Sequence, residues 1–140
     1  MATSTTATRK LFVNLAVRDL PRAMAFWRKL GFSFNPQFTD DHAACMIVSD
    51  DAYVMLLSEA RFRDFAKKPV SDPSKQTEAL YCLSASSRGE VDQLVRTAIE
   101  SGGSAAAAPQ DHGMVYVSSF NDPDGHHWEV AWMDPSAIQK

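Results

Sequence analysis

The apolar pattern along the first half of the chain predicts a strand, a helix and three further strands. Residues 11–17 are rich in β-branched and large apolar side chains, as in a strand. Asp19 follows as a helix N-cap, and an apolar stripe predicts a helix over 19–30 that ends at Gly31. The remaining strands of this half are expected at 32–34, 43–48 and 53–57.

The second half repeats this order after a polar, proline-containing stretch at 67–77 that has the composition of a linker. Ser87 and Glu90 form an S-x-x-E capping box, and the apolar stripe that follows predicts a helix that stops at Gly102. The strands of this half are expected at 79–85, 104–107, 114–120 and 127–133, with a turn at 121–125. Residues 12–15 align with 80–83 at an offset of 68, which indicates an internal duplication.

The segment 61–68 also has a helical pattern, with Phe62, Phe65 and Ala66 on its apolar edge. Its basic side would attract an anionic ligand, although a solvated helix face explains the pattern more simply.

Composition and charge exclude several classes of function. The chain has 140 residues, 45% of them hydrophobic, and its 14 basic and 17 acidic residues give a net charge of −3, so nucleic acid is not an expected partner. Since no apolar run is long enough for a membrane span or a signal peptide, we expect a cytoplasmic protein with no membrane partner. Cys45 and Cys82 form no C-x-x-C pair, so free thiols are expected.

Two motifs frame the duplicated region. The first module runs from a strand into V-x-D-L at 17–20, an aromatic-bearing helix and L-G-F at 30–32; the second closes with D-P-D-G-x-x-W-E at 122–129. Over about residues 10–135 the chain resembles the vicinal oxygen chelate superfamily, which includes glyoxalase I, bleomycin resistance proteins and extradiol dioxygenases. The segments NPQFTD, YVMLL and WMDP are similar to its uncharacterised branch described as predicted lactoylglutathione lyases.

The resemblance implies an α+β fold in which tandem βαβββ modules form a curled mixed sheet with a central cleft. The chain would be a single glyoxalase-like domain over 1–140, with modules at about 10–66 and 78–135 and a linker at 67–77. Members of the superfamily commonly dimerise, so a homodimer is expected.

The resemblance also locates the metal-ligand positions of the superfamily, one on the first and one on the last strand of each module. By counting from the motifs, these positions fall at Phe12, Met55, Leu80 and Glu129. Only Glu129 offers a carboxylate, whereas divalent ions take oxygen, nitrogen or thiolate ligands. No metal cofactor is therefore expected, and a divalent metal at Glu129 is the lesser alternative.

Side chains at i and i+2 of a strand share one face, which assigns residues to the cleft. The sets 13, 15, 17 and 128, 130, 132 should pack under the helices, because they are entirely apolar. The cleft is then an apolar site with a few polar anchors, the usual form of a small-molecule site. The expected ligand-binding residues are Phe12, Asn14, Tyr53, Met55, Leu80, Cys82, Glu129 and, from a loop, His112.

Each polar candidate has a simpler explanation beside the functional one. Glu129 is either a catalytic or ligand-binding carboxylate, or a hydrogen-bonded acid that holds the last strand. His126 and His127 should point to opposite faces of a strand, so a shared metal ion is not expected. His112 is more simply a solvated loop histidine, and Cys82 has no predicted histidine to make it nucleophilic.

Three functions remain open from the sequence. The first is a binding protein of the bleomycin-resistance type, which holds a small, partly apolar molecule without changing it. The alternative is a metal-dependent lyase, similar to lactoylglutathione lyase, or a dioxygenase, with Glu129 as ligand and base. A structural or regulatory domain is the third, because fold alone does not determine function.

Overall fold

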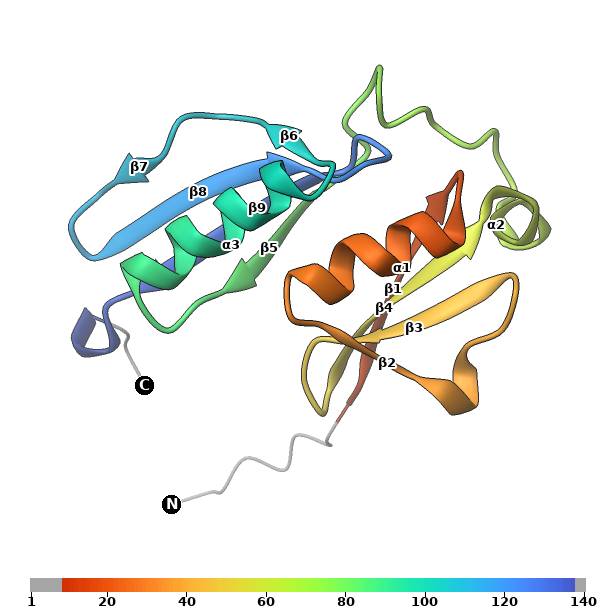
Figure 1. The fold of residues 1–140 in the computed structure, drawn as a ribbon, viewed down its shortest axis with the longest axis horizontal. Helices are drawn as coiled ribbons and strands as arrows, with labels where there is room; N and C mark the ends of the chain where they lie inside the picture. Colours follow the sequence, from red (N-terminus) through yellow and green to blue (C-terminus); the bar gives the residue numbers. More distant parts are fainter. Residues whose placement is uncertain (1–8, 138–140) are drawn as a thin grey trace. The chain divides into compact units, whose positions relative to one another are not determined.

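The structure, a computed structural model, describes residues 9–137 and contains a β-α-β-β-β arrangement followed by a second one that has one additional short strand, β7 (Figure 1). The first arrangement contains β1 (Leu11–Val17), α1 (Leu20–Lys29), β2 (Ser33–Asn35), the 3-10 turn η1 (Pro36–Phe38), β3 (Ala43–Ile47), β4 (Ala52–Ser58) and α2 (Glu59–Phe65). The second contains β5 (Leu80–Ser84), α3 (Arg88–Glu100), β6 (Ser104–Ala105), β7 (Gln110–Asp111), β8 (Val115–Asn121), β9 (His127–Met133) and the 3-10 turn η2 (Pro135–Ala137). The predicted α+β class is confirmed.

The chain divides into two compact units. The first unit holds the described residues up to Met24 together with Phe32–Lys68, and the second holds Ala25–Gly31 and the described chain from Pro69 onward. The C-terminal half of α1 thus belongs to the second unit. Among residues 9–137, no helix is long and apolar enough to cross a membrane.

Each unit contains one mixed sheet, and the two sheets have the same connectivity. The strand order is β1-β4-β3-β2 in the first sheet and β5-β9-β8-β6 in the second, where β7 also pairs with β8. In both, the first strand runs parallel to the last strand of its module, β1 beside β4 and β5 beside β9. The remaining pairs are antiparallel.

The registers of the two sheets agree with the duplication. Asn14 lies opposite Met55 in the first sheet, and Cys82 lies opposite Glu129 in the second. The offset of 68 residues places Asn14 at the position of Cys82. Met55 and Glu129 therefore occupy equivalent positions in the two sheets.

Local hydrogen bonds explain where α1 and α3 begin and end. The Asp19 carboxylate accepts a hydrogen bond from the Arg22 amide at 3.1 Å, and the Ser87 hydroxyl accepts one from the Glu90 amide at 3.1 Å. Both predicted N-caps are confirmed. Gly31 follows α1 with a φ of +99°, a left-handed conformation that glycine adopts without steric cost.

The core of the second unit is an aromatic cluster beneath α1 and α3. The Trp27 ring centroid lies 4.6 Å from that of Trp128 and 6.1 Å from that of Phe120, and all three side chains are buried. In the first unit, Leu15 and Val17 are buried on one face of β1. Leu15, Val17 and Trp128, which belong to the sets predicted to pack under the helices, are thus buried.

Two boundaries differ from the sequence prediction. The helix expected over 61–68 ends at Phe65, and Ala66 is extended. The nearby sequence explains why the helix does not continue to residue 68, because Lys68 precedes Pro69 and helical backbone is disfavoured for a residue before proline.

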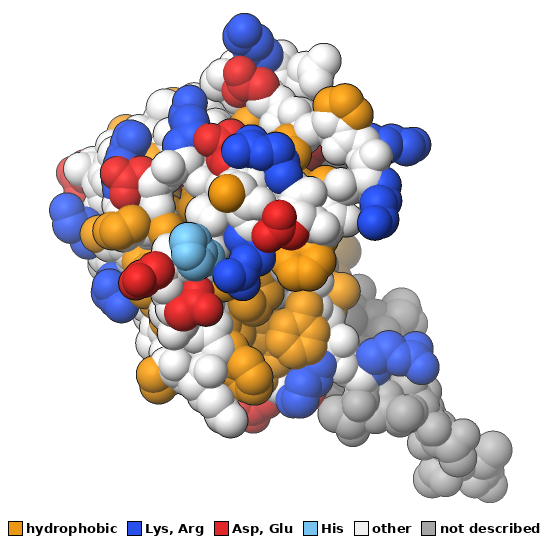
Figure 2. Space-filling model, turned by 90° about the vertical axis from the view of Figure 1, so that its right-hand side faces the viewer, with side chains coloured by type: hydrophobic (Ala, Val, Ile, Leu, Met, Phe, Trp, Pro, Cys, Tyr) orange, Lys and Arg blue, Asp and Glu red, His pale blue; other side chains and the backbone are white. Residues whose placement is uncertain are grey.

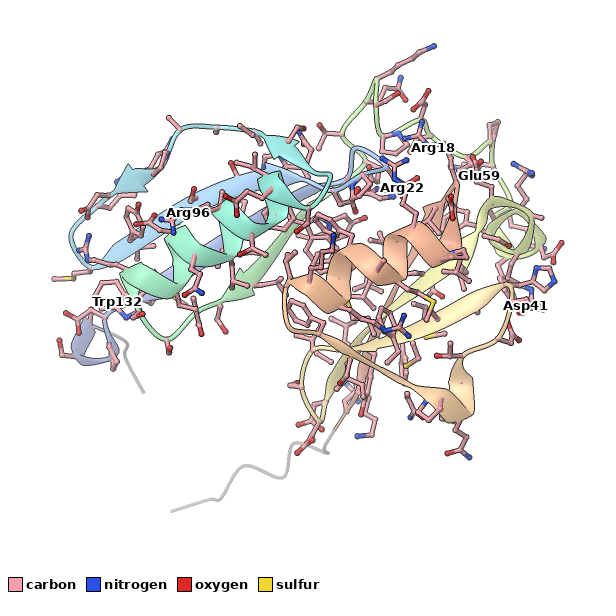
Figure 3. All side chains as sticks on the ribbon, in the orientation of Figure 1. Arg18, Arg22, Asp41, Glu59, Arg96 and Trp132 are labelled. Atoms are coloured by element: carbon pink, nitrogen blue, oxygen red, sulfur yellow. The ribbon has the colours of Figure 1, made fainter. Side chains whose placement is uncertain are left out.

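The second difference is β7, which lies in a segment expected to be a loop. Two residues of β7 pair with β8, and Asp111 of this strand forms an ion pair with Arg88 at the start of α3. Arg88 also packs over the rings of Tyr116, at 5.5 Å, and Trp132, at 5.0 Å. Trp132 lies near the end of β9 (Figure 3). A strand this short depends on such distant partners, which local periodicity does not report.

Candidate functional site

Four of the predicted ligand-binding residues lie on one face of the first sheet. Phe12 is opposite Tyr53 and Asn14 is opposite Met55 on the adjacent strands β1 and β4. Because Phe12 and Asn14 are two residues apart, all four side chains point to the same side. This face is opposite the one on which Leu15 is buried.

Helix α2 contacts β1 and β4 and forms one wall of a pocket on the first unit. The pocket, which we call the α2 pocket, has a volume of about 460 Å³. On the side shown in Figure 2, apolar side chains gather in a hollow, with charged side chains of both signs around it. The lining residues are Asn14, Leu57, Phe62, Phe65 and Ala66.

The polar group of the α2 pocket is the side-chain amide of Asn14. Its Nδ2 donates a long hydrogen bond of 3.4 Å to the Phe12 carbonyl, and no other hydrogen bond of this side chain occurs among residues 9–137. Asn14 is exposed, whereas Leu57 is buried at the base of the lining. The amide oxygen and most of the donor capacity of Nδ2 are therefore open to a bound molecule.

Beyond Asn14, the same face carries an aromatic pair. The rings of Phe12 and Tyr53 stack with centroids 5.0 Å apart and an interplanar angle of 14°, and Phe12 is 50% exposed. Lys10 lies over the Tyr53 ring at 5.7 Å. Its ammonium donates to the Asp50 carbonyl at 2.6 Å and lies 3.7 Å from the Asp51 carboxylate, which offsets its charge locally.

Three further predicted residues share a face of the second sheet. Glu129 lies between Cys82 on β5 and Ser119 on β8, and Leu80 is two residues from Cys82. Burial and then the nearby Glu129 carboxylate raise the pKa of the Cys82 thiol, so it is protonated at neutral pH and is a poor nucleophile. Seven of the predicted ligand-binding residues therefore lie on sheet faces, four on one face of the first sheet and three on one face of the second.

His127, which the sequence pattern did not single out as a site residue, also lies on this second face. Its Nε2 lies 3.5 Å from Oε2 of Glu129, and this nitrogen is buried without a hydrogen-bond partner among the described residues. Strand alternation could have indicated this contact, because His127 precedes Glu129 by two residues and the two side chains therefore share a face of the strand. His126 instead places Nδ1 2.8 Å from Glu78, so the two histidines do point in different directions.

Glu78 joins a second polar cluster that the sequence did not predict. Its Oε2 also accepts a hydrogen bond from the Tyr81 hydroxyl at 2.8 Å. Partial burial alone would raise the pKa of Glu78, but hydrogen bonds from its own amide, Tyr81 and His126 lower it overall. Burial and the contact with Glu78 raise the pKa of Tyr81. This cluster holds the end of the linker on the second unit.

His112, the remaining predicted residue, lies in the turn between β7 and β8. It is exposed, and its Nε2 is 3.3 Å from Oε1 of Gln110. Nothing in its surroundings distinguishes it from a solvated loop histidine.

The donor set does not fit the divalent metal that the superfamily resemblance implies. Phe12, Met55 and Leu80 occupy three of the four ligand positions, and a phenyl ring, a thioether and an alkyl chain do not bind Mg²⁺, Mn²⁺ or Zn²⁺ in place of oxygen or nitrogen donors. Within residues 9–137, no group of three or more histidine, cysteine, aspartate or glutamate side chains has an arrangement that could hold a metal ion.

Comparisons with known proteins agree with this architecture. A hypothetical protein from S. aureus has a solved structure with a TM-score of 0.74 and 26% identity, covering 94% of this chain and 95% of its own. The structure of a glyoxalase/bleomycin resistance protein/dioxygenase family enzyme from Burkholderia phytofirmans PsJN has a TM-score of 0.72 and 17% identity. The match covers 87% of this chain and 96% of that enzyme. The structure of the bleomycin resistance determinant encoded on the transposon Tn5 has a TM-score of 0.60 and 20% identity. The match covers 89% of this chain and 98% of that protein.

No curated protein matches the chain. The family profile described as Glyoxalase/Bleomycin resistance protein/Dioxygenase superfamily matches residues 10–130. This match covers both modules, from the first strand to the acid of the last. The chain therefore belongs to the glyoxalase/bleomycin resistance protein/dioxygenase superfamily.

Proposed function

We propose that this protein binds a small, partly apolar molecule in the α2 pocket, without a resident metal ion. The observation that carries the proposal is the composition of the pocket, in which one amide, from Asn14, stands among Leu57, Phe62, Phe65 and Ala66. Apolar surface supplies affinity, and a single polar group selects orientation. The volume of about 460 Å³ is within the usual range for small-molecule sites.

The side chains that build the pocket are better suited to binding than to chemistry. Among residues 9–137, its lining includes no titratable side chain and no nucleophile. The Cys82 thiol, on the other sheet, has a raised pKa. The metal-dependent lyase or dioxygenase alternative relies on Glu129, which is the single carboxylate at the four ligand positions. The homodimer expected from the sequence stays a prediction.

Replacement of Asn14 by leucine is expected to change which molecules bind without unfolding the protein. In a thermal-shift screen of small aromatic and aliphatic compounds, those with a hydrogen-bonding group should lose about five- to ten-fold in affinity, because the amide contributes about 1 kcal/mol. Purely apolar compounds should bind at least as well. Met114→Ala, at an exposed residue outside the pocket, is the control. Equal affinities of wild type and Asn14→Leu for every compound would contradict the proposed site.

Metal content tests the same proposal against the metal-dependent alternative. Protein dialysed against zinc, nickel or manganese and then against buffer should retain far less than one equivalent of metal by mass spectrometry. Ligand affinity should be the same before and after treatment with a chelator. One tightly held ion per chain, lost in Glu129→Gln, would support the lyase or dioxygenase alternative instead.

A further inference from the structure

We propose that the α2 pocket selects an amphipathic anion, a small molecule with an aromatic or aliphatic body and a carboxylate or sulfonate head. This inference rests on the proposed function and adds the chemical class of the ligand. It requires an apolar surface for the body, a cation for the head and no opposing acid at the pocket.

The apolar surface comes mainly from α2. Phe62 and Phe65 are one helical turn apart and both line the pocket, and Phe65 is 68% exposed although it is a large apolar residue. Ala66 and the buried Leu57 complete the apolar wall. Burial of an exposed phenylalanine ring by a ligand removes apolar area from water and contributes favourably to binding.

The cations come from Lys67 and Lys68, directly after Ala66. Both are exposed, and neither forms an ion pair within the described part of the chain. Their flexible stems allow each ammonium to reach an anion held beside Ala66. Lys10, which directly precedes β1, differs because Asp51 and the Asp50 carbonyl already contact its ammonium.

Helix α2 carries two acids, Glu59 and Asp64, and two arginines, Arg61 and Arg63, so its own side-chain charges balance and leave the lysines uncompensated. Neither acid is among the described lining residues, and Asp64 forms a long ion pair of 3.9 Å with Arg61 within the helix. The carbonyl end of α2 faces the same region, but a helix end carries at most about half a negative charge, against two full positive charges. The Asn14 amide can donate to the anionic head as well.

The test uses two fluorescent probes that differ in charge. Anilinonaphthalene sulfonate is anionic, and phenylnaphthylamine has the same ring system without the sulfonate. Wild type should bind both, with the anionic probe tighter at low salt. Lys67→Gln/Lys68→Gln should weaken the anionic probe about three- to ten-fold and leave the neutral probe unchanged. Lys75→Gln, at an exposed lysine of the second unit, is the matched control.

Phe65→Ala separates this inference from the proposed function. It should weaken both probes about five- to ten-fold, because it removes wall surface and no charge. If the double lysine variant binds the anionic probe as wild type does while Phe65→Ala weakens both, the pocket is retained and the anionic selectivity is wrong. If Phe65→Ala and Asn14→Leu leave both probes unchanged, the pocket itself is wrong and the proposed function fails with it.

Discussion

Replacement of Trp27 by alanine is expected to lower the free energy of unfolding by about 3–5 kcal/mol. The indole is 1% exposed and contacts three aromatic rings, those of Phe26, Phe120 and Trp128. Replacement by alanine removes the buried apolar area of the indole and its edge contacts with the other rings. It also leaves a cavity that the neighbouring backbone cannot fill. Urea denaturation followed by circular dichroism measures the change.

Phe38→Ala is the matched control for this prediction, because Phe38 is also a large aromatic residue but is 59% exposed. It should change the free energy of unfolding by less than about 0.5 kcal/mol. Trp27→Phe keeps part of the ring contact and should fall between the two. A loss in Trp27→Ala no greater than in Phe38→Ala would show that the aromatic cluster contributes little to stability.

Replacement of Asp122 by alanine is expected to cost about 2–4 kcal/mol. The side chain is 5% exposed, and Oδ1 accepts hydrogen bonds from the amides of Asp124 and His126, both at 3.0 Å. Oδ2 accepts one from Nε1 of Trp128 at 3.1 Å. Alanine leaves these buried donors without partners, and each unmet donor costs more than an ordinary hydrogen bond contributes. Urea denaturation measures the loss.

Asp40→Ala is the control, because Asp40 makes the same kind of contact at the surface. Its Oδ1 accepts from the amides of His42 and Ala43 at 2.8 and 3.0 Å, and water can replace it there. Its loss should stay below about 1 kcal/mol. If the two variants lose the same stability, the burial of Asp122 does not matter.

The pH dependence of Asp122 can be isolated with Asp122→Asn. Burial raises the pKa of Asp122 in the folded state above its unfolded value near 3.8, although His126 and the hydrogen bonds oppose this rise. The folded state therefore binds the proton more tightly, and stability falls as pH rises from about 4 through the folded pKa. Relative to Asp122→Asn, wild type should lose stability over that interval and stay level above it. A constant difference across the interval would contradict the raised pKa.

Local patterns in the sequence predicted most of the fold. The stripe that begins after Ser87 and the alternation of β1 and β9 depend on near neighbours along the chain, so they can be read without a structure. The turn at 121–125 could be predicted for the same reason. Periodicity also identified Phe62 and Phe65 as one edge of a helix, although it wrongly extended that helix over Ala66, and it could not show that these residues line a pocket.

The rest of the site depends on contacts between distant residues. Asn14 lines the α2 pocket because α2 packs against β1 and β4, a tertiary contact with no signature in either segment. Glu78 and His126 are 48 residues apart and meet only in the folded chain. The two faces of the predicted cleft could be assigned from alternation, whereas the pocket on one of them could not.

Because the two modules share one strand register, the same pair of facing backbone positions occurs twice in the protein, each time with different side chains. Asn14 with Met55 is the first version, and Cys82 with Glu129 is the second. The backbone pairing is the same at both pairs. A carboxylate introduced at position 55 would therefore have the same position in the strand pairing as Glu129 has in the second sheet. The duplication thus provides an internal reference for redesign, in which side-chain chemistry changes while strand pairing stays the same.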